Sequence, residues 1–368
     1  MDGEFLSSSP PGPGPGPGPE APSPDSVHLV LRCVMAPVYV LVFTVGLLGN
    51  VTLVRIFISS RAARGVPSVF ISSLAAGDLL LLLTCVPVDA FRFFSEEWLL
   101  GAAACKLIAV IQLTSVGVSV FTLTALSADR YRAVVTPMDI QASSAVSWTC
   151  LKAASIWLLA VLLAVPEAVF SQVVSMQGVD TNATFTNCVP YPLSNPVHPR
   201  VHSVLVFLVY FLVPLAVISV FYYHIARTLT QSAHDMPGEV SDPTKRQVET
   251  RKRLARVVLV LVGVFALCWF PTHLLYMYRS FHYHQVDLSP AHMVVTLLAR
   301  VLSFSSSCVN PFALYLLSGS FRRHFNSQLR CGHGPAPERQ AGSLQSTSHI
   351  RLTSIKKTTP SNRQEVAL

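Results

Sequence analysis

The chain has 368 residues, of which 51% are hydrophobic and 12% are charged, and its formal net charge is +8. Soluble domains usually carry about 25% charged residues, so this composition excludes an ordinary soluble protein and indicates a chain that folds in lipid. The positive charge does not require a nucleic-acid partner, because basic residues on the cytoplasmic side of a membrane protein account for it.

The N-terminal segment, residues 1–33, is rich in proline and glycine, as in PPGPGPGPGP at 10–19. Such a composition cannot bury a core, so we predict a disordered extracellular tail. Residues 1–26 lack the apolar stretch of a secretory signal peptide. The first apolar run is therefore expected to direct membrane insertion itself.

Seven apolar runs follow, each long enough to cross the hydrocarbon core of a bilayer as a helix. A buried helix of a soluble protein could account for one such run, but not for seven in succession. We therefore predict an all-α membrane protein with a seven-transmembrane helix bundle over residues 34–317. The runs are 34–58, 69–91, 103–128, 151–170, 203–223, 257–278 and 293–317.

Lysine and arginine residues predict the orientation, because they favour the cytoplasmic connectors. They concentrate on the inner side if the N-terminus lies outside, most densely in KRQVETRKRLARVV at 245–258. We expect a multi-pass protein of the plasma membrane with its C-terminus in the cytoplasm. The inner end of the sixth run is a candidate docking surface, although ordinary positive-inside charge explains part of it.

The outer loops contain groups open to secretory-pathway chemistry. On the predicted topology Cys105 and Cys188 both face an oxidising compartment, which permits a disulfide. The sequon at Asn182 lies in the second outer loop and is a candidate glycosylation site, whereas the sequon at Asn50 lies inside the first run.

The segment 318–331 follows the seventh run and predicts an amphipathic helix on the inner membrane surface. Phe321, Phe325 and Leu329 recur every four residues, with arginines at other positions. Cys331 at its end is a candidate for palmitoylation or an unmodified cysteine. The polar, Ser/Thr-rich segment 332–368 is predicted to be a disordered cytoplasmic tail.

Asp78 is the most costly polar residue within the runs, because an unpaired carboxylate is expensive in a bilayer. Two interpretations stay open, a hub of structural hydrogen bonds and an allosteric sodium site. The residues at suitable depth to contact it are Asn50, Ser119, Ser306, Ser307 and Asn310.

Prolines occur in five of the runs and permit kinks, and Trp269 stands two residues before one of them in CWFP. The indole is well placed to respond to a ligand above it or simply to pack. The runs contain no second acid at the level of Asp78 and no other catalytic constellation, so we expect no enzyme. They also lack internal repeats and a filter-like loop, which disfavours a transporter or channel.

These motifs together resemble the rhodopsin-like family of G-protein-coupled receptors. The resemblance rests on DRY at 129–131, CWFP at 268–271 and NP at 310–311, and on Asn50, Asp78, Trp157 and Pro214. Within that family, stretches such as CVPVDA, AVPEAVFS and SCVNPFALYLLS resemble the bombesin-like peptide receptors. The similarity covers roughly residues 30–330, and it implies that Cys105 and Cys188 form a disulfide.

The resemblance implies an activation switch at the inner end of the bundle. Arg130 is expected to pair with Asp129 at rest and to turn toward the G protein on activation, with Tyr222 supporting the active arrangement. The remaining residues of the implied switch are Tyr131, Phe265, Trp269, Asn310 and Pro311. It likewise implies a sodium pocket made of Asp78, Ser119, Ser306 and Asn310.

The resemblance also implies a peptide site at the outer end, lined by Gln112, Glu167, Pro190, Arg279 and Arg300. Gln112 stands where amine receptors carry an aspartate, and a neutral amide cannot be the counter-ion of an ammonium. Arg300 is expected to meet the ligand or an acid, with Glu167 and Asp89 as candidates. Arg279 is expected at the water-exposed outer end of the sixth run.

The chain departs from the family pattern at three positions. Leu314 stands where a tyrosine usually follows NP, and Tyr315 is displaced by one residue. Ser306 replaces a frequent asparagine of the sodium pocket, and Thr272 follows CWFP. The implied partners are an amidated bombesin-like peptide, a Gq-class G protein, arrestin and receptor kinases at the tail, and membrane lipids; no cofactor is expected apart from the sodium ion.

Overall fold

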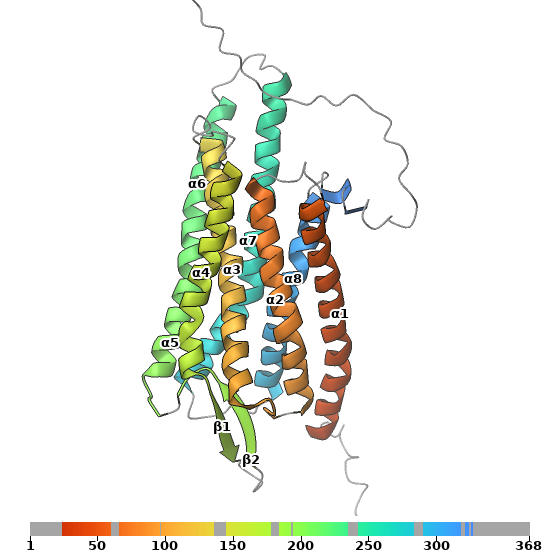
Figure 1. The fold of residues 1–368 in the computed structure, drawn as a ribbon, viewed down its shortest axis with the longest axis vertical. Coiled ribbons are helices and arrows are strands. Elements are labelled where there is room, and N and C mark those ends of the chain that lie inside the picture. Colours follow the sequence, from red (N-terminus) through yellow and green to blue (C-terminus); the bar gives the residue numbers. More distant parts are fainter. Residues whose placement is uncertain are drawn as a thin grey trace, which may run out of the picture. The chain divides into compact units, whose positions relative to one another are not determined.

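The computed structural model describes residues 24–59, 66–95, 97–135, 145–177, 184–192, 194–234, 242–282, 290–317, 321–323 and 325–326. Within these ranges the chain forms helices and one hairpin of two strands (Figure 1). The sites expected at Asn182 and Cys331 lie outside the described residues, as do the tail at 332–368 and residues 1–23 of the N-terminal segment.

Among the described residues, seven helical stretches are long and apolar enough to cross a membrane, which confirms the predicted fold class. The elements are α1 (Pro24–Ser59), α2 (Val66–Ser95), α3 (Gly101–Val135), α4 (Ala145–Phe170), α5 (His198–Phe207), η3 (Leu208–Leu212), α6 (Val213–His234), α7 (Asp242–Phe281) and α8 (Pro290–Leu317). The fifth span consists of α5, η3 and α6 in succession, so α7 is the sixth span and α8 the seventh.

Most of the helices extend well beyond the apolar runs that predicted them. α1 begins at Pro24, so the boundary expected between the tail and the bundle at residue 33 falls inside a helix. Hydropathy marks only the part of a helix that lies in lipid, whereas the backbone hydrogen-bond ladder continues into water. A proline is also favourable in the first turn of a helix, because its missing N–H has no partner there.

The fifth span contains a π-helical turn, η3, directly before Pro214. Pro214 has no N–H to donate to the carbonyl of Tyr210, four residues earlier. The ladder changes register at this point, and the N–H of Val213 donates to the carbonyl of Leu208. Such a change of register is one way in which a helix accommodates a lost hydrogen bond.

α3 occupies the centre of the bundle, where it contacts α2, α4, α6 and α7 (Figure 1). α8 packs against α1, α2 and α7. The contact between α1 and α8 requires a glycine at position 49, because a Cβ there would lie 2.6 Å from the Pro311 side chain. The spans are therefore packed closely enough for side chains from distant segments to meet.

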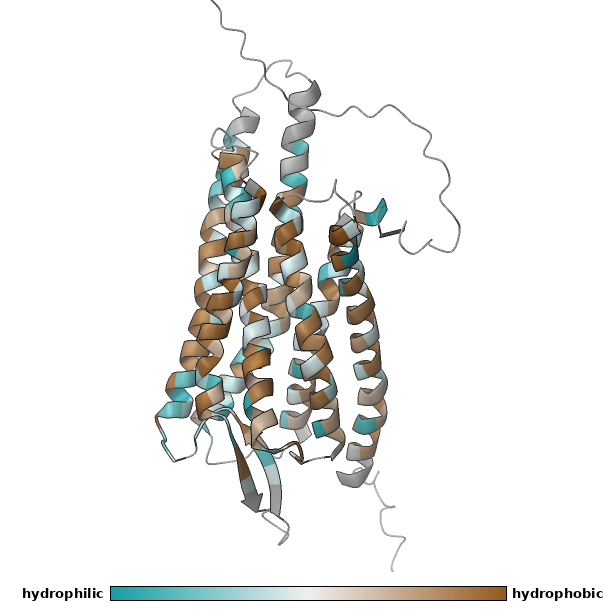
Figure 2. Ribbon diagram, in the orientation of Figure 1, coloured by the Kyte–Doolittle hydropathy of each residue, from teal (hydrophilic) through white to brown (hydrophobic). Residues whose placement is uncertain are grey.

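Apolar residues occur along most of the length of the spans, as the brown colour in Figure 2 shows. Phe70, Leu82 and Leu123 are almost fully buried between helices. Leu48 and Leu267, in contrast, are 68% and 75% exposed on the outer surface. A protein in water would not expose so much apolar surface, whereas a helix bundle surrounded by lipid does.

Two strands form an antiparallel hairpin between α4 and α5, at the lower end of the view in Figure 1. β1 (Gln172–Gln177) pairs with β2 (Thr184–Val189), and Val173 lies opposite Cys188. On the predicted topology this is the extracellular end. The sequence predicts a loop here, and the two strands were not expected.

Candidate functional site

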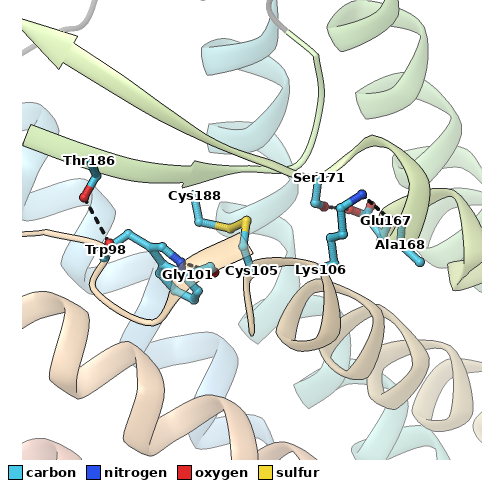
Figure 3. Close-up of a disulfide and its surroundings, with 9 residues drawn as sticks. All are labelled: Trp98, Gly101, Cys105, Lys106, Glu167, Ala168, Ser171, Thr186 and Cys188. Carbon is cyan, nitrogen blue, oxygen red and sulfur yellow. Dashed lines mark hydrogen bonds between the residues drawn. A yellow bond between two sulfur atoms is a disulfide. The ribbon is translucent and has the colours of Figure 1, made fainter. Parts of the chain in front are cut away.

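A disulfide between Cys105 and Cys188 joins the outer end of α3 to β2, which confirms the predicted pair (Figure 3). A second connection holds the hairpin beside the chain that leads into α3. The backbone N–H of Trp98 donates to the carbonyl of Thr186 over 2.9 Å, and the Thr186 hydroxyl donates to the carbonyl of Trp98 over 3.0 Å. The hairpin is therefore fixed at two points over the outer end of the bundle.

Lys106, next to the disulfide, contacts the end of α4. Its ammonium group donates to the carbonyl of Ala168 over 2.8 Å (Figure 3). It also donates to the carbonyl of Val169 over 3.1 Å. Carbonyls in the last turn of a helix lack partners within the helix and carry partial negative charge. Lys106 thus caps α4 and keeps it close to α3 at the level of the hairpin.

A cavity of about 330 Å³ opens at this outer end of the bundle. All five residues that the sequence assigned to a ligand site line it, namely Gln112, Glu167, Pro190, Arg279 and Arg300. The structure adds Asp89, Arg92, His273 and Tyr276 to the lining, none of which was assigned to the ligand site from the sequence. The cavity reaches inward as far as Trp269.

Arg300 meets Asp89 and not Glu167, which decides between the two acids proposed from the sequence. Its Nε lies 3.2 Å from the Oδ2 of Asp89, and the hydroxyl of Tyr39 donates to the same oxygen over 2.6 Å. Arg300 therefore has a structural partner, and its charge is balanced before any ligand binds. It still lines the cavity beside that partner.

Glu167 belongs to a separate polar cluster on the wall formed by α4, α5 and α7. It is 5% exposed, and one of its oxygens accepts a hydrogen bond from the Ser171 hydroxyl over 3.3 Å. The other oxygen lies 3.1 Å from the Nε2 of His202. The Nδ1 of His202 shares a hydrogen bond of 2.7 Å with the hydroxyl of Tyr276.

His202 and Tyr276 were not among the site residues predicted from the sequence. Both residues lie in the outer parts of their helices, where polar groups are common, and nothing local distinguishes them from residues that face water. Their depth next to an intramembrane acid is the only signal that could have suggested a role.

We expected Arg279 to be exposed to water at the outer end of the sixth span, and the structure shows that this expectation was wrong. Its side chain is half-buried and donates from Nε to the Nε2 of His292 over 3.2 Å. A second nitrogen donates to the hydroxyl of Thr296 over 2.5 Å. The first turns of α8 supply these neighbours, which a sequence alone does not place beside α7.

Trp269 lies at the inner limit of the cavity and is 5% exposed. Its indole N–H donates to the Ser306 hydroxyl over 3.2 Å. Its ring centroid lies 6.2 Å from that of Phe265 and 6.5 Å from that of His273. A ligand that fills the cavity would therefore contact the indole itself and His273, which both line it.

Asp78 accepts two hydrogen bonds from α8, from the Ser307 hydroxyl over 2.9 Å and from the Asn310 amide over 2.7 Å. Ser306, which the sequence placed in this pocket, bonds instead with Trp269 and with the carbonyl of Ser303. Consecutive helical residues point in directions about 100° apart, so one serine faces Asp78 and the other faces Trp269.

Ser119 is buried, and within the described ranges no hydrogen bond links it to Asp78. The contacts with Ser307 and Asn310 agree with a structural hydrogen-bond hub. A carboxylate oxygen can accept more than one bond, and neutral hydroxyls stand nearby. The carboxylate oxygens of Asp78 and the hydroxyl oxygen of Ser307 are therefore also suitable ligands for a small monovalent cation.

Arg130 at the inner end of α3 pairs with its neighbour Asp129, as the resemblance implied for the resting state. Arg130 is 7% exposed, and its Nε has no hydrogen-bond partner among the described residues. The hydroxyl of Tyr222 on α6 donates to the carbonyl of Ala255 on α7 over 2.8 Å. The Tyr131 ring packs on Phe221 of α6, with 5.4 Å between the centroids.

The displaced tyrosine of the seventh span contacts the segment that follows it. The hydroxyl of Tyr315 donates to the Oδ1 of Asn326 over 3.3 Å, and its ring centroid lies 5.2 Å from that of Phe325. Leu314, at the usual position of the tyrosine, is 4% exposed among apolar neighbours. Of the segment 318–331, for which we predicted a surface helix, the structure describes residues 321–323 and 325–326, which are helical; the rest of that prediction lies outside the described residues.

Comparison with known proteins assigns this architecture to a family. Residues 49–315 match the model of the 7 transmembrane receptor (rhodopsin family). A bombesin receptor of Bombina orientalis is 50% identical over 332 residues, which cover 90% of this chain and 85% of the relative. Bombesin receptor subtype-3 of Ovis aries is 49% identical over 315 residues, which cover 85% and 79% of the two chains.

Proposed function

Since the chain belongs to the rhodopsin family of seven-transmembrane receptors and, within it, to the bombesin receptors, we propose that amidated bombesin-like peptides activate it and that it signals through a Gq-class G protein and phospholipase C. Members of this family are receptors in the plasma membrane and not enzymes. The peptide class and the G-protein class are the proposal; the fold, location and receptor character are established by the family.

The charge of the outer cavity is the main structural support for a peptide as the ligand. Three arginines and two acids line it, and Arg300 neutralises one of the acids, Asp89. The central position on α3 is the neutral amide of Gln112. Such a cavity offers no excess negative charge to an ammonium ligand, whereas guanidinium groups can donate hydrogen bonds to peptide carbonyls.

The subtype within the bombesin receptors is a finer proposal. LLAVPEAVFS at 162–171, CWFP at 268–271 and the final EVAL resemble the neuromedin B receptor most, and we propose neuromedin B as the preferred peptide. The gastrin-releasing peptide receptor is the alternative. In both alternatives the peptide binds in the same cavity, and the two subtypes differ only in which peptide they prefer.

The proposed activation begins where the cavity reaches Trp269. A peptide that presses on this indole would strain its hydrogen bond to Ser306 and its packing on Phe265, and thus favour a different position of α7. α7 is connected to α6 at the inner end through Tyr222 and Ala255. A shift there would open the space into which Arg130 turns when it leaves Asp129.

Further proposals concern an ion and the cytoplasmic partners. Asp78 with Asn310, Ser119 and the hydroxyl of Ser306 or Ser307 would hold an allosteric sodium ion in the resting receptor. Arrestin and receptor kinases would act on the Ser/Thr-rich tail, Cys331 would carry a palmitate and Asn182 a glycan. The tail, Cys331 and Asn182 lie outside the described residues, and only the sequence supports these three proposals.

The test is calcium release in cells that express the chain, with increasing concentrations of amidated neuromedin B and gastrin-releasing peptide. We expect both to act, neuromedin B at the lower concentration, and a Gq-selective inhibitor to abolish the response. Greater potency of gastrin-releasing peptide would select the alternative subtype. No response to either peptide, at confirmed surface expression, would contradict the proposed ligand class.

A further inference from the structure

The polar cluster around His202 connects three spans at the wall of the cavity. His202 comes from α5, Glu167 from α4 and Tyr276 from α7. The two ring nitrogens of His202 each have a partner, with Glu167 at 3.1 Å on one side and Tyr276 at 2.7 Å on the other. A ring held at both nitrogens has a fixed orientation. His202 therefore fixes where the Glu167 carboxylate lies.

The geometry also shows how protonation of His202 would change the charge at this wall of the cavity. While His202 is neutral, the nitrogen beside Glu167 can carry the ring hydrogen, and the nitrogen beside Tyr276 accepts from the phenol. Glu167 then keeps its full negative charge at the surface of the cavity. Protonation makes His202 a cation 3.1 Å from the carboxylate, which turns this contact into an ion pair and cancels the charge.

Other titratable and charged groups face this cluster. His198 stacks on His202 from one turn earlier in α5, with 5.7 Å between the ring centroids. Tyr191, from the connection between β2 and α5, stacks on Tyr276 at 6.3 Å, and burial raises the pKa of its phenol, so it stays neutral. The remaining groups are Lys106 of α3, which caps α4, Tyr210 of η3, which lies within electrostatic range of Glu167, and Arg279 of α7, which lies within range of Tyr191.

Among these groups the two histidines are the side chains of the type that titrates near neutral pH when unperturbed. His202 is the one in contact with Glu167, whereas the Nδ1 of His198 is buried without a partner among the described residues. The ring of His198 packs instead on Phe170, with 4.4 Å between the centroids. The two histidines are therefore distinguishable by mutation, since only one of them contacts the carboxylate.

We propose that His202 is a positioning residue of the peptide site, which holds the Glu167 carboxylate toward a hydrogen-bond donor of the peptide and weakens peptide binding when it becomes protonated. The inference rests on the proposed function, because the carboxylate concerned lines the cavity assigned to the peptide. It adds a second property, a dependence of affinity on extracellular pH, that the peptide assignment alone does not require.

The test is competition binding of one amidated bombesin-like peptide to membranes at pH 7.4 and pH 6.0. For the unmodified receptor we expect about threefold or greater loss of affinity at the lower pH, because protonation of His202 would cancel the charge of the Glu167 carboxylate 3.1 Å away. His202→Gln keeps an amide donor near the Glu167 oxygen but cannot become charged. It should bind nearly normally at pH 7.4 and show little change at pH 6.0.

Two further variants separate positioning from a general structural effect. His202→Ala releases Glu167 and should lower affinity at both pH values, whereas His198→Gln should keep the pH dependence of the unmodified receptor. The same peptide is used throughout, so its own titration cancels between variants. Staining of an N-terminal tag at the cell surface shows whether each variant is folded and delivered.

The inference is overturned if the unmodified receptor binds the peptide equally at both pH values, or if His202→Gln retains the full pH dependence. It is also overturned if His202→Ala binds like the unmodified receptor at pH 7.4. In each of these cases peptide binding itself would persist, and the proposed function would stand. Absence of peptide binding at pH 7.4 would instead contradict the proposed function, and this inference with it.

Discussion

Asp89 on α2 and Arg300 on α8 form an ion pair at the outer end of the bundle, and Tyr39 on α1 donates a hydrogen bond to the same carboxylate. The first two spans and the seventh, which is far from them in the sequence, are thus tied together beside the cavity. Both charged side chains are largely removed from solvent, with exposed fractions of 16% for Asp89 and 18% for Arg300. Removing one partner of such a pair leaves the other charge uncompensated.

Arg300→Ala should impair peptide binding more than Arg279→Ala. The first change leaves Asp89 without its cationic partner, and breaking a well-buried ion pair in this way costs about 3–5 kcal/mol. The second change removes only hydrogen bonds to His292 and Thr296. Competition binding with an amidated bombesin-like peptide, corrected for surface expression, measures the difference. Greater damage from Arg279→Ala would place the ligand nearer the outer end than the cavity suggests.

The double variant Asp89→Asn with Arg300→Gln is the matched control. It removes both charges and keeps polar side chains of similar size, so surface expression should recover relative to Arg300→Ala. If affinity recovers as well, Arg300 acts only by pairing with Asp89. If affinity stays low, Arg300 contacts the peptide directly.

Asp129→Asn should raise signalling in the absence of ligand by several-fold, because it removes the charge that pairs with Arg130. Arg130 has no acid other than Asp129 within ion-pair distance among the residues described, so it would be free to leave its resting position. Basal inositol phosphate at equal surface expression is the measurement. An unchanged basal level would show that this pair does not hold the receptor at rest.

Cys105→Ser and Cys188→Ser should each reduce surface delivery or peptide binding by a similar amount. The bridge fixes the hairpin over the cavity, and both cysteines line that cavity. Since one bond is lost in either case, the double variant should be no worse than the single ones. Normal binding by both single variants would mean that the contact of Trp98 with Thr186 is sufficient.

Charge reversal at Arg253 and Arg256 should weaken G-protein coupling while peptide binding is retained. Both side chains are exposed at the inner end of α7, far along the helix from the cavity. Calcium release and binding to membranes without G protein are measured in parallel. Equal loss in both assays would indicate misfolding, and no loss in either would mean that these charges serve only to orient the helix in the membrane.

Asp78→Asn should abolish any effect of sodium on agonist binding, because a neutral amide cannot balance the charge of the ion. We expect sodium chloride, compared with an equal concentration of an organic chloride salt, to lower agonist affinity in the unmodified receptor. An unmodified receptor that responds equally to both salts would leave Asp78 as a hydrogen-bond hub for Ser307 and Asn310.

The sequence by itself determined the seven spans and the topology. These features depend on the solvent preference of each segment: a run of apolar side chains enters lipid whatever its neighbours are, and basic residues stay on the cytoplasmic side. The motifs at 129–131, 268–271 and 310–311 likewise identified the family without knowledge of any contact, and the comparison with known proteins confirmed it.

The tertiary structure alone decided which polar groups meet. The sequence offered two acids to Arg300 and three serines to Asp78, and the structure selected Asp89 and Ser307. It also packed the half-buried Arg279 against α8 and placed His202 beside Glu167. The physical reason is that contacts between spans depend on the rotation and depth of each helix, which follow from the packing of whole helices and not from the local sequence.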